Sequence, residues 1–344
     1  MVNFDRIDAM LITSRENVRY ITGFSGSAGI CVCFPEKKYL LTDFRYKEQS
    51  ALEAKDCEII IITKKYSEYV KDILTEKGAK TLGFEPDSLS YGEYMAYSEI
   101  AENFIPYGEF TKDLRIIKSE EELKNIEKAA DIASDALLET LPLIGEGVSE
   151  KDIAAELDYR MRKLGASGNS FDTISIGGKN SSVVHGQPGD YKLQYGDFLL
   201  IDFGCVYNGY CSDMTRTFAV GEISKRKQEV YDVVLSAQKA ALAALKPGAL
   251  ASEVDRVARD IICDAGFGDC FGHALGHGVG LLIHEPPTMN PKSEVVLSPG
   301  MTVTVEPGIY IEGEFGVRIE DLTVITDNFH QNLSQKIGKE VIYI

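Results

Sequence analysis

Several features of other protein classes are absent from this chain of 344 residues. Charged residues interrupt every apolar stretch well before the roughly 18 residues that a membrane-spanning helix needs. The N-terminus has neither the basic region nor the apolar region of a signal peptide. The seven cysteines form no C-x-x-C pair and no zinc-finger spacing, so we expect reduced, mostly buried thiols. These absences predict a soluble protein of the cytoplasm.

Positive charge is also scarce in this sequence. Lys and Arg total 36 against 53 Asp and Glu, which leaves a formal net charge of −17. A surface of this sign repels phosphate groups, so we expect neither nucleic acid nor an anionic membrane as a partner. Hydrophobic residues make up 44% of the chain and charged residues 26%, which is typical of a globular protein. At about 150 residues per domain, the length predicts two domains.

Residues 1–115 alternate short apolar runs with turn signals and a helical pattern. Val70, Ile73 and Leu74 have helical spacing, whereas the isoleucine-rich run near residue 60 is typical of a strand. This alternation predicts an α/β domain, and the charged stretch 112–122 is interpreted as the linker that follows it. Strands are expected at residues 9–13, 28–34, 39–42, 58–63 and 80–84, with a helix at 67–76.

The rest of the chain, residues 116–344, repeats a pattern. Ser119 with Glu122 forms a capping box that opens a helix, and Ser149 opens a second helix. Strands follow, and the same order returns with helices that open at Ser224 and Ser252, 105 and 103 residues further on. We predict an α+β domain with a pseudo-twofold repeat and a site at its central seam. The alternative is a chance recurrence, because serine caps are common.

The first half of this repeat contains a predicted hairpin with an acid on each strand. An apolar strand that reads Leu-Leu-Ile-Asp-Phe-Gly carries Asp202. Asn208 and Gly209 form the strongest short hairpin signal. A two-residue turn there places Asp202 opposite Thr215 and puts Asp213 on the same face as a diagonal neighbour. Both carboxylates are therefore within reach of one site.

Two carboxylates on an apolar face repel each other and lose their charge unless something positive lies between them. A metal ion is the simplest candidate for that positive group. Two solvent-facing acids are the alternative, which the hydrophobic flanks of both strands disfavour. Asp202 and Asp213 therefore predict a metal site.

A second acid pair occupies matching positions in the other half. An apolar strand ends in Glu306, and after a turn the returning strand contains Arg318 and Glu320. A three-residue turn at 312–314 places Glu320 opposite Glu306, with Arg318 on the same face. The offsets of 104 and 107 residues from the first pair agree with the pitch of the repeat. Four carboxylates are therefore expected to converge on the seam.

The sequence contains few histidines, and most of them lie in glycine-rich segments. Of the five histidines, His330 is interpreted as a structural residue, and four lie in two glycine-rich segments: His185, His273, His277 and His284. Imidazoles beside carboxylates favour Mn²⁺ or a similar divalent ion over a zinc ion bound by thiolates. Four carboxylates also balance two divalent ions, the usual arrangement for activating water.

These motifs resemble the pita-bread metallopeptidases, the family that includes methionine aminopeptidase, aminopeptidase P and prolidase. Residues 119–344 are similar to the catalytic domain. The segments 17–24 (Asn-Val-Arg-Tyr-Ile-Thr-Gly-Phe) and 41–46 (Leu-Thr-Asp-Phe-Arg-Tyr) are similar to the N-terminal domain of the Xaa-Pro branch. The resemblance implies a creatinase/prolidase-type α/β domain at residues 1–115 and a pita-bread metallopeptidase domain at 116–344.

The resemblance also implies a metal centre. Two divalent ions, manganese by preference and cobalt, zinc or iron as alternatives, would be held by five ligands: Asp202, Asp213, His277, Glu306 and Glu320. Asp213 and Glu320 would bridge the two ions. Glu306 would also accept the proton of the attacking water.

Four further residues receive roles from the resemblance. His284 would stabilise the tetrahedral intermediate, and His185 would lie near the scissile amide. His273 and Arg318 would line the substrate pocket or order the site. A homodimer is the implied assembly.

The implied activity is hydrolysis of the Xaa-Pro bond at the N-terminus of short peptides, whose amide is tertiary and carries a rigid ring. Thr288 stands where some prolidases have an arginine that holds the free carboxylate, so Xaa-Pro dipeptidase and aminopeptidase P both stay open. A non-catalytic pita-bread protein that binds peptides or proteins is one alternative, and a creatinase-like amidinohydrolase is another. The filled ligand positions disfavour both alternatives.

Overall fold

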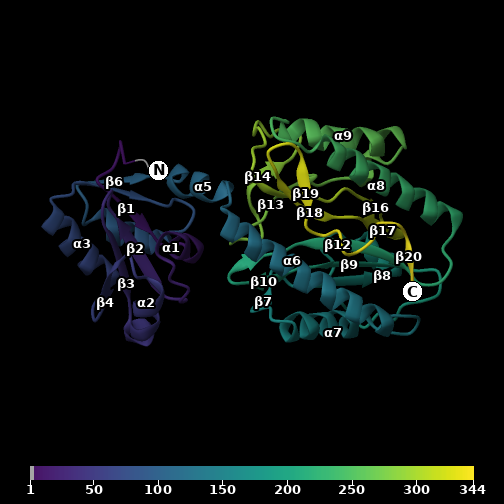
Figure 1. Cartoon of the computed structure of the whole chain (residues 1–344), viewed down its shortest axis with the longest axis horizontal. Helices are drawn as coiled ribbons and strands as arrows, with labels where there is room; N and C mark the ends of the chain where they lie inside the picture. The colour runs from purple at the N-terminus through teal and green to yellow at the C-terminus, as the bar shows by residue number, and fades with distance from the viewer. Residues whose placement is uncertain (1–3) are drawn as a thin grey trace. The chain divides into compact units, whose positions relative to one another are not determined.

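The computed structural model describes residues 4–344, except for the side chains of residues 109 and 111–113. The chain forms two compact units, Met1–Arg115 and Ile116–Ile344, whose helices and strands are drawn in Figure 1. None of the helices within residues 4–344 offers an apolar stretch that could cross a membrane.

A six-stranded mixed sheet forms the centre of the first unit. Strand β1 pairs antiparallel with β2 and parallel with β5, so the sheet extends on both sides of it. The order across the sheet is β4 (Glu58–Ile61), β3 (Lys38–Thr42), β2 (Gly29–Cys33), β1 (Ala9–Ile12), β5 (Thr81–Phe84) and β6 (Asn103–Pro106). Five of these strands lie where the sequence predicts them, whereas β6 is not predicted.

Both faces of this sheet are buried. Successive side chains of a strand point to opposite faces, so each strand contributes to the packing on both. Leu11 of β1 packs with residues of α3 on one face, and Met10 packs with Val18 of α1 on the other. The helices of this unit are α1 (Arg15–Thr22), α2 (Lys47–Glu53), α3 (Tyr66–Lys77), α4 (Tyr91–Ser98) and α5 (Glu109–Ile116), with a 3₁₀ turn at η1 (Phe44–Tyr46). The α/β prediction is confirmed.

The charged stretch 112–122, which is interpreted as a linker, contains the division between the two units and is helical at both ends. Helix α5 continues to Ile116 and the next helix begins at Glu120, which leaves residues 117–119 between them. The acidic residues belong to the first turn of that next helix, where the helix dipole favours negative charge.

Four long helices flank the strands of the second unit, as Figure 1 shows. They lie in two pairs on opposite sides of the strands: α6 (Glu120–Thr140) with α7 (Glu150–Lys163), and α8 (Lys225–Ala244) with α9 (Ala251–Asp264). Short 3₁₀ turns occur at η2 (Leu141–Leu143), η3 (Gly178–Ser182) and η4 (Gly268–Cys270).

Three of the four predicted serine caps are confirmed. The side-chain oxygen of each accepts a hydrogen bond from a backbone amide three residues later: Ser119, Ser149 and Ser224. The predicted cap at Ser252 is wrong, because this residue lies inside the first turn of α9. Leu250 occupies the N-cap position instead, where a backbone bridge to Val296 holds it.

The strands of the second unit form two larger and two smaller sheets within the described residues. The larger ones have the orders β20 (Ile342–Tyr343), β12 (Met214–Ala219), β9 (Phe198–Phe203), β8 (Ile174–Gly177), and β14 (Glu285–Met289), β13 (Gly276–Gly278), β15 (Thr302–Val305), β18 (Asp321–Ile325), β19 (His330–Asn332). The smaller ones are β11 (Tyr210–Cys211), β10 (Cys205–Tyr207), β7 (Gly168–Asn169), and β16 (Gly308–Ile311) with β17 (Phe315–Arg318).

The predicted register of the first hairpin is confirmed. Tyr207 pairs with Tyr210, and Asp202 pairs with Thr215. Asn208 and Gly209 have φ values of 46° and 82°, the left-handed conformation that a two-residue hairpin turn requires at both positions.

The second hairpin also has the predicted three-residue turn, since Ile311 pairs with Phe315. Further along the same register, Val305 pairs with Asp321. Glu306 and Glu320 are each one residue closer to the turn than that pair. The register therefore places the two acids opposite each other, as the sequence predicts.

Candidate metal centre and active site

Alternation along β9 turns Asp202 away from the hydrophobic core. Its neighbours Ile201 and Phe203 are fully buried in a cluster with residues of α6 and α7, so Asp202 projects from the opposite face into a cavity. Its Oδ2 accepts a hydrogen bond of 2.6 Å from Nη2 of Arg318. Asp213 reaches the same cavity from the residue before β12 and is only 5% exposed.

Threonine hydroxyls hold the two glutamates of the second half. Oγ1 of Thr304 donates to Oε1 of Glu306 over 3.1 Å, and Oγ1 of Thr215 donates to Oε2 of Glu320 over 2.6 Å. Thr304 precedes Glu306 by two residues and shares its face, whereas Thr215 comes from the first hairpin. The second bond therefore ties a ligand candidate of one half to a strand of the other.

His277 lies between acids of both halves. Its Nε2 is 3.5 Å from Oδ2 of Asp213 and 3.4 Å from Oε1 of Glu306. The preceding Gly276 allows β13 to lie close to β15, because a Cβ at this position would collide with the carbonyl oxygen of Thr304. The backbone amide of His277 also donates to Oγ1 of Thr304 over 3.0 Å.

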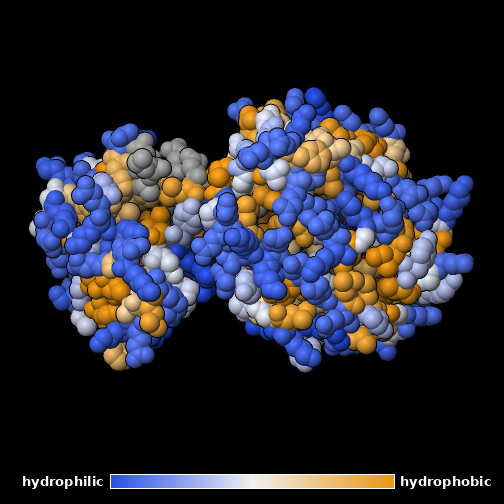
Figure 2. Space-filling model, viewed as in Figure 1, coloured by the Kyte–Doolittle hydropathy of each residue, from blue (hydrophilic) through white to orange (hydrophobic). Residues whose placement is uncertain are grey.

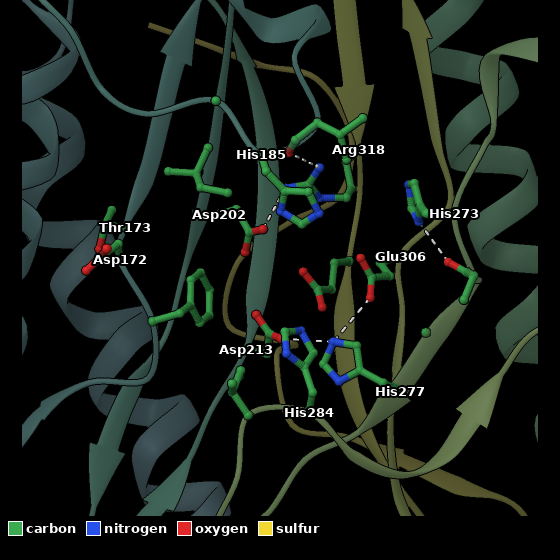
Figure 3. Close-up of a pocket in the computed structure, with 18 of the residues that line it drawn as sticks. Asp172, Thr173, His185, Asp202, Asp213, His273, His277, His284, Glu306 and Arg318 are labelled. Carbon is green, nitrogen blue, oxygen red and sulfur yellow. Dashed lines mark hydrogen bonds and ion pairs between the residues drawn. The ribbon is translucent and has the colours of Figure 1, made fainter. Parts of the chain in front are cut away.

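The candidate ligands converge on one centre. One ligand atom from each of Asp213, His277 and Glu320 lies within 4.8 Å of the other two. Figure 3 shows the labelled Asp202, Asp213, His277 and Glu306 pointing toward this centre from different strands, with His284 beside His277. The ring centroids of His277 and His284 are 4.4 Å apart. The surrounding cavity has a volume of about 750 Å³.

Burial and mutual repulsion disfavour negative charge on these acids. Burial raises the pKa of Glu306 to about 8. Burial, followed by repulsion from Glu320 and Asp202, raises the pKa of Asp213 well above its usual range. Burial and repulsion from Glu306 raise the pKa of Glu320 in the same direction. Burial lowers the pKa of His277 to about 4, so its imidazole is neutral and able to bind a cation at neutral pH.

The donor set therefore fits one or more divalent cations. Oδ1 of Asp202 and Oε1 of Glu320 are buried and accept no hydrogen bond from any described residue of the chain. Buried oxygens without a partner are costly, and a cation would satisfy both of them. Carboxylates with one imidazole and no thiolate form a site for a hard or borderline metal ion.

A second group of polar residues lies beside this centre. Nη1 of Arg318 donates to the hydroxyl of Tyr310 over 2.7 Å, and Nε2 of His273 lies 3.1 Å from that hydroxyl. Burial, with a smaller effect of the Arg318 charge, lowers the pKa of His273 to about 4. Tyr310 thus connects the two residues that the resemblance assigns to the substrate pocket.

Thr288 lines the cavity, and so does every predicted site residue: Asp202, Asp213, His277, Glu306, Glu320, His185, His273, His284 and Arg318. Their placement agrees with the predicted roles, which stay predictions. His330 has no place in this lining; its Nδ1 lies 3.0 Å from the carbonyl oxygen of Leu245.

Sequence reasoning assigned no role in the site to Thr215, Thr304, Tyr310 or Arg216. The period of two along the strands could have identified Thr304, because it shares the face of Glu306. Arg216 had no local signal: it is fully buried, and its guanidinium donates to the backbone oxygen of Glu320 and to Oδ1 of Asp321.

The fold and the site together define a metal-dependent hydrolase built on two pseudo-equivalent halves. Residues 124–327 match the model of the metallopeptidase family M24, and residues 4–117 match the creatinase/prolidase N-terminal domain. The chain belongs to metallopeptidase family M24, and it has the predicted pita-bread fold.

Named relatives span nearly the whole chain. An Xaa-Pro dipeptidase of Pyrococcus horikoshii is 40% identical over 338 residues, which cover 98% of this chain and 95% of the relative. The solved structure of an Xaa-Pro dipeptidase from Bacillus anthracis matches with a TM-score of 0.96 at 42% identity, covering 98% of this chain and 95% of that one. An X-Pro aminopeptidase from Thermotoga maritima matches with a TM-score of 0.92 at 36% identity and covers 98% of each chain.

Proposed function

We propose that this protein hydrolyses the Xaa-Pro bond at the N-terminus of short proline-containing peptides. The observation that carries the proposal is the convergence of Asp213, His277 and Glu320 within 4.8 Å, with Asp202 and Glu306 in the same cavity. Relatives named for this activity, at about 40% identity over nearly the full chain, support the same substrate class.

The proposed centre holds two divalent ions, with manganese as the native metal. By the family resemblance, Asp213 and Glu320 would be ligands of both ions. Asp202 would hold one ion, and His277 with Glu306 would hold the other. When bound, the ions supply a water molecule with a lowered pKa and polarise the scissile carbonyl.

Glu306 is proposed as the group that accepts the proton from the attacking water. Its Oε1 is held by the hydroxyl of Thr304, which leaves its other oxygen free of that bond. A general base has to accept a proton at the working pH, and a carboxylate whose pKa is raised toward neutrality can do so. The adjacent cations would lower this pKa and restore the basic form.

The imidazoles and the arginine are proposed to bind the substrate. His284 lies against the ring of His277, and it is proposed to donate a hydrogen bond to the developing oxyanion. His185 is proposed to lie near the scissile amide. His273 and Arg318, which share the hydroxyl of Tyr310, are proposed to line the proline pocket and keep Asp202 in place.

Dipeptidase and aminopeptidase P activity stay open for this site. Thr288 lines the cavity and pairs with His277 across β13 and β14. Its neutral hydroxyl offers no positive charge to the free carboxylate of a dipeptide. We expect the length preference to depend on what else contacts the residue after proline.

The test compares the dipeptide Ala-Pro with the tripeptide Ala-Pro-Ala, using metal-stripped protein before and after addition of Mn²⁺ and mass spectrometry of the products. Metal-dependent cleavage of the dipeptide alone identifies an Xaa-Pro dipeptidase. Preferential cleavage of the tripeptide identifies an aminopeptidase P. Cleavage of neither, with metal bound, contradicts the proposal and favours a peptide-binding protein.

We also propose a homodimer in the cytoplasm. All seven cysteines are free thiols, which supports a reducing compartment. Size-exclusion chromatography with light scattering tests the assembly, and fractionation of the source cells tests the location.

A further inference from the structure

His185 depends on the backbone around it for its position. It lies between η3 and β9 in a segment without regular structure, and its side chain is exposed within the cavity. Figure 3 shows its ring near Asp202 and Arg318. No hydrogen bond from another described side chain holds this imidazole. The backbone beside it has one long contact from the cavity, in which Nη1 of Arg318 donates to the carbonyl oxygen of Val184 over 3.4 Å.

Glu150, the first residue of α7, contacts that segment at both ends. Its Oε1 accepts hydrogen bonds from the backbone amide of Gly177 over 2.7 Å and from Nδ2 of Asn180 over 2.9 Å. Its Oε2 accepts one from the backbone amide of Gly189 over 2.9 Å. The residue is 1% exposed. A single carboxylate thus joins the start and the end of the chain that carries His185.

This arrangement is specific to a carboxylate. Only a deprotonated carboxyl group offers two acceptor oxygens and no donor, and all three contacts on Glu150 are N–H donors. A buried charge is costly unless it is compensated, and these donors together with the N-terminus of α7 compensate it. Backbone bonds from Glu150 to Tyr191 and from Lys151 to Gly189 strengthen the same junction.

We propose that Glu150 is a positioning residue that holds residues 178–188 so that His185 stays directed into the cavity. The inference rests on the proposed function for the role of His185, but not for the holding of the segment. Glu150 does not line the cavity and belongs to none of the strands that carry the metal-ligand candidates. Its effect should therefore reach activity through His185 and leave metal binding intact.

The matched variants are Glu150→Gln and Glu156→Gln. In Glu150→Gln, the side-chain NH₂ replaces one acceptor oxygen and faces an N–H donor of the segment, so at least one of these donors loses its acceptor. In the second, the same change is made on the same helix at a residue that pairs with Arg160 and does not contact the segment. We expect kcat/KM for Ala-Pro or Ala-Pro-Ala to fall on the order of a hundredfold in Glu150→Gln. The control should change by less than about threefold, and bound Mn²⁺ should be unchanged in both.

A double-mutant comparison separates positioning from a general structural role. If Glu150 acts through His185, then Glu150→Gln should cost less than about threefold in a His185→Ala background. Hydrogen–deuterium exchange of the metal-loaded protein should show faster exchange in 177–189 for Glu150→Gln, with α8 and α9 unchanged. Additive losses, or exchange equal to that of Glu156→Gln, would overturn the proposal.

Two further outcomes are also decisive. If Glu150→Gln does not fold, Asn180→Ala removes one of the three contacts from the segment side, and its loss must likewise vanish in the His185→Ala background. If the metal-loaded wild-type protein cleaves neither peptide, the proposed function fails. The exchange experiment then still decides whether Glu150 holds the segment.

Discussion

The two halves of the second unit each present a pair of acids to the seam, but they do so through different hairpins. In the first half, a two-residue turn sets the register that pairs Asp202 with Thr215. In the second half, a three-residue turn sets the register that places Glu306 opposite Glu320. The turn length differs, yet each hairpin presents two acids to the seam. The repeat therefore preserves the face on which the two acids lie but not their pairing, because the acids are diagonal neighbours in the first half and opposite each other in the second.

The position after the second acid differs sharply between the halves. Met214 follows Asp213 and packs into the hydrophobic cluster beneath α6 and α7. Asp321 follows Glu320 and is also fully buried, but it forms an ion pair of 2.8 Å with Arg216. Arg216 comes from β12 of the first half, so this ion pair links the two hairpins. Both halves therefore contribute acids to the site, but the residue behind the second acid is held by apolar packing in one half and by an ion pair in the other.

The largest expected effect comes from removing a bridging acid in either half. Asp213→Ala and Glu320→Ala should each lose bound metal, because each removes a ligand that both ions would share. Since the ions supply several kcal/mol of transition-state stabilisation, kcat/KM should fall by roughly 10³-fold or more. Metal analysis and steady-state kinetics measure this, with the exposed Asp190→Ala as control. Retention of two ions by one variant only would break the equivalence of the halves.

Glu306→Gln tests whether one acid of the second half has a chemical role that its counterpart lacks. The amide keeps one oxygen for a metal ion but cannot accept a proton, so turnover should fall by about 10²- to 10⁴-fold with metal retained. Glu312→Gln, in the exposed turn of the same hairpin, is the control. Unchanged turnover in the metal-loaded variant would eliminate the proposed proton transfer.

Asp321→Asn should destabilise the protein far more than a change at its counterpart Met214. The substitution leaves the buried guanidinium of Arg216 without its anion, which costs roughly 3–5 kcal/mol. Met214→Leu preserves volume and apolar character, so its cost should stay below about 1.5 kcal/mol. Urea unfolding of metal-loaded protein compares them, and equal losses would contradict the asymmetry.

The metal-induced gain in melting temperature should grow between pH 5 and pH 8. In the metal-free protein, burial raises the pKa of Glu306 from 4.5 to about 8. The stability this group contributes is present at low pH and is lost as the pH rises through about 8. Bound cations remove that loss. Scanning calorimetry with and without Mn²⁺ measures the difference, and Glu306→Gln should flatten the slope of the metal-free protein.

The smallest expected effect is on stability, and it comes from the serine near the start of the second helix of each half. Ser149 caps α7 through its side chain, so Ser149→Ala should cost about 1 kcal/mol. Ser252 lies inside α9 and caps nothing, so Ser252→Ala should stay within about 0.5 kcal/mol. Denaturant unfolding of both variants checks the difference, and a larger loss at Ser252 would contradict the observed helix start.

Local sequence signals were sufficient for most of the fold that surrounds the site. Asn208 with Gly209 specifies a turn whose backbone few other residues adopt, and alternation then propagates the register along both strands. The serine caps likewise act within one helical turn. The errors lie where distant contacts compete with such signals: at Ser252, the bridge from Leu250 to Val296 sets the helix start instead.

The sequence by itself determined which acids face the seam, because turn length and a period of two are properties of neighbouring residues. Only the tertiary structure decided what holds those acids and the histidines in place. Arg216 and Asp321 are 105 residues apart, and Glu150 reaches Gly189 across 39 residues. Contacts of this kind depend on how packed elements meet in space, and no local pattern encodes that meeting.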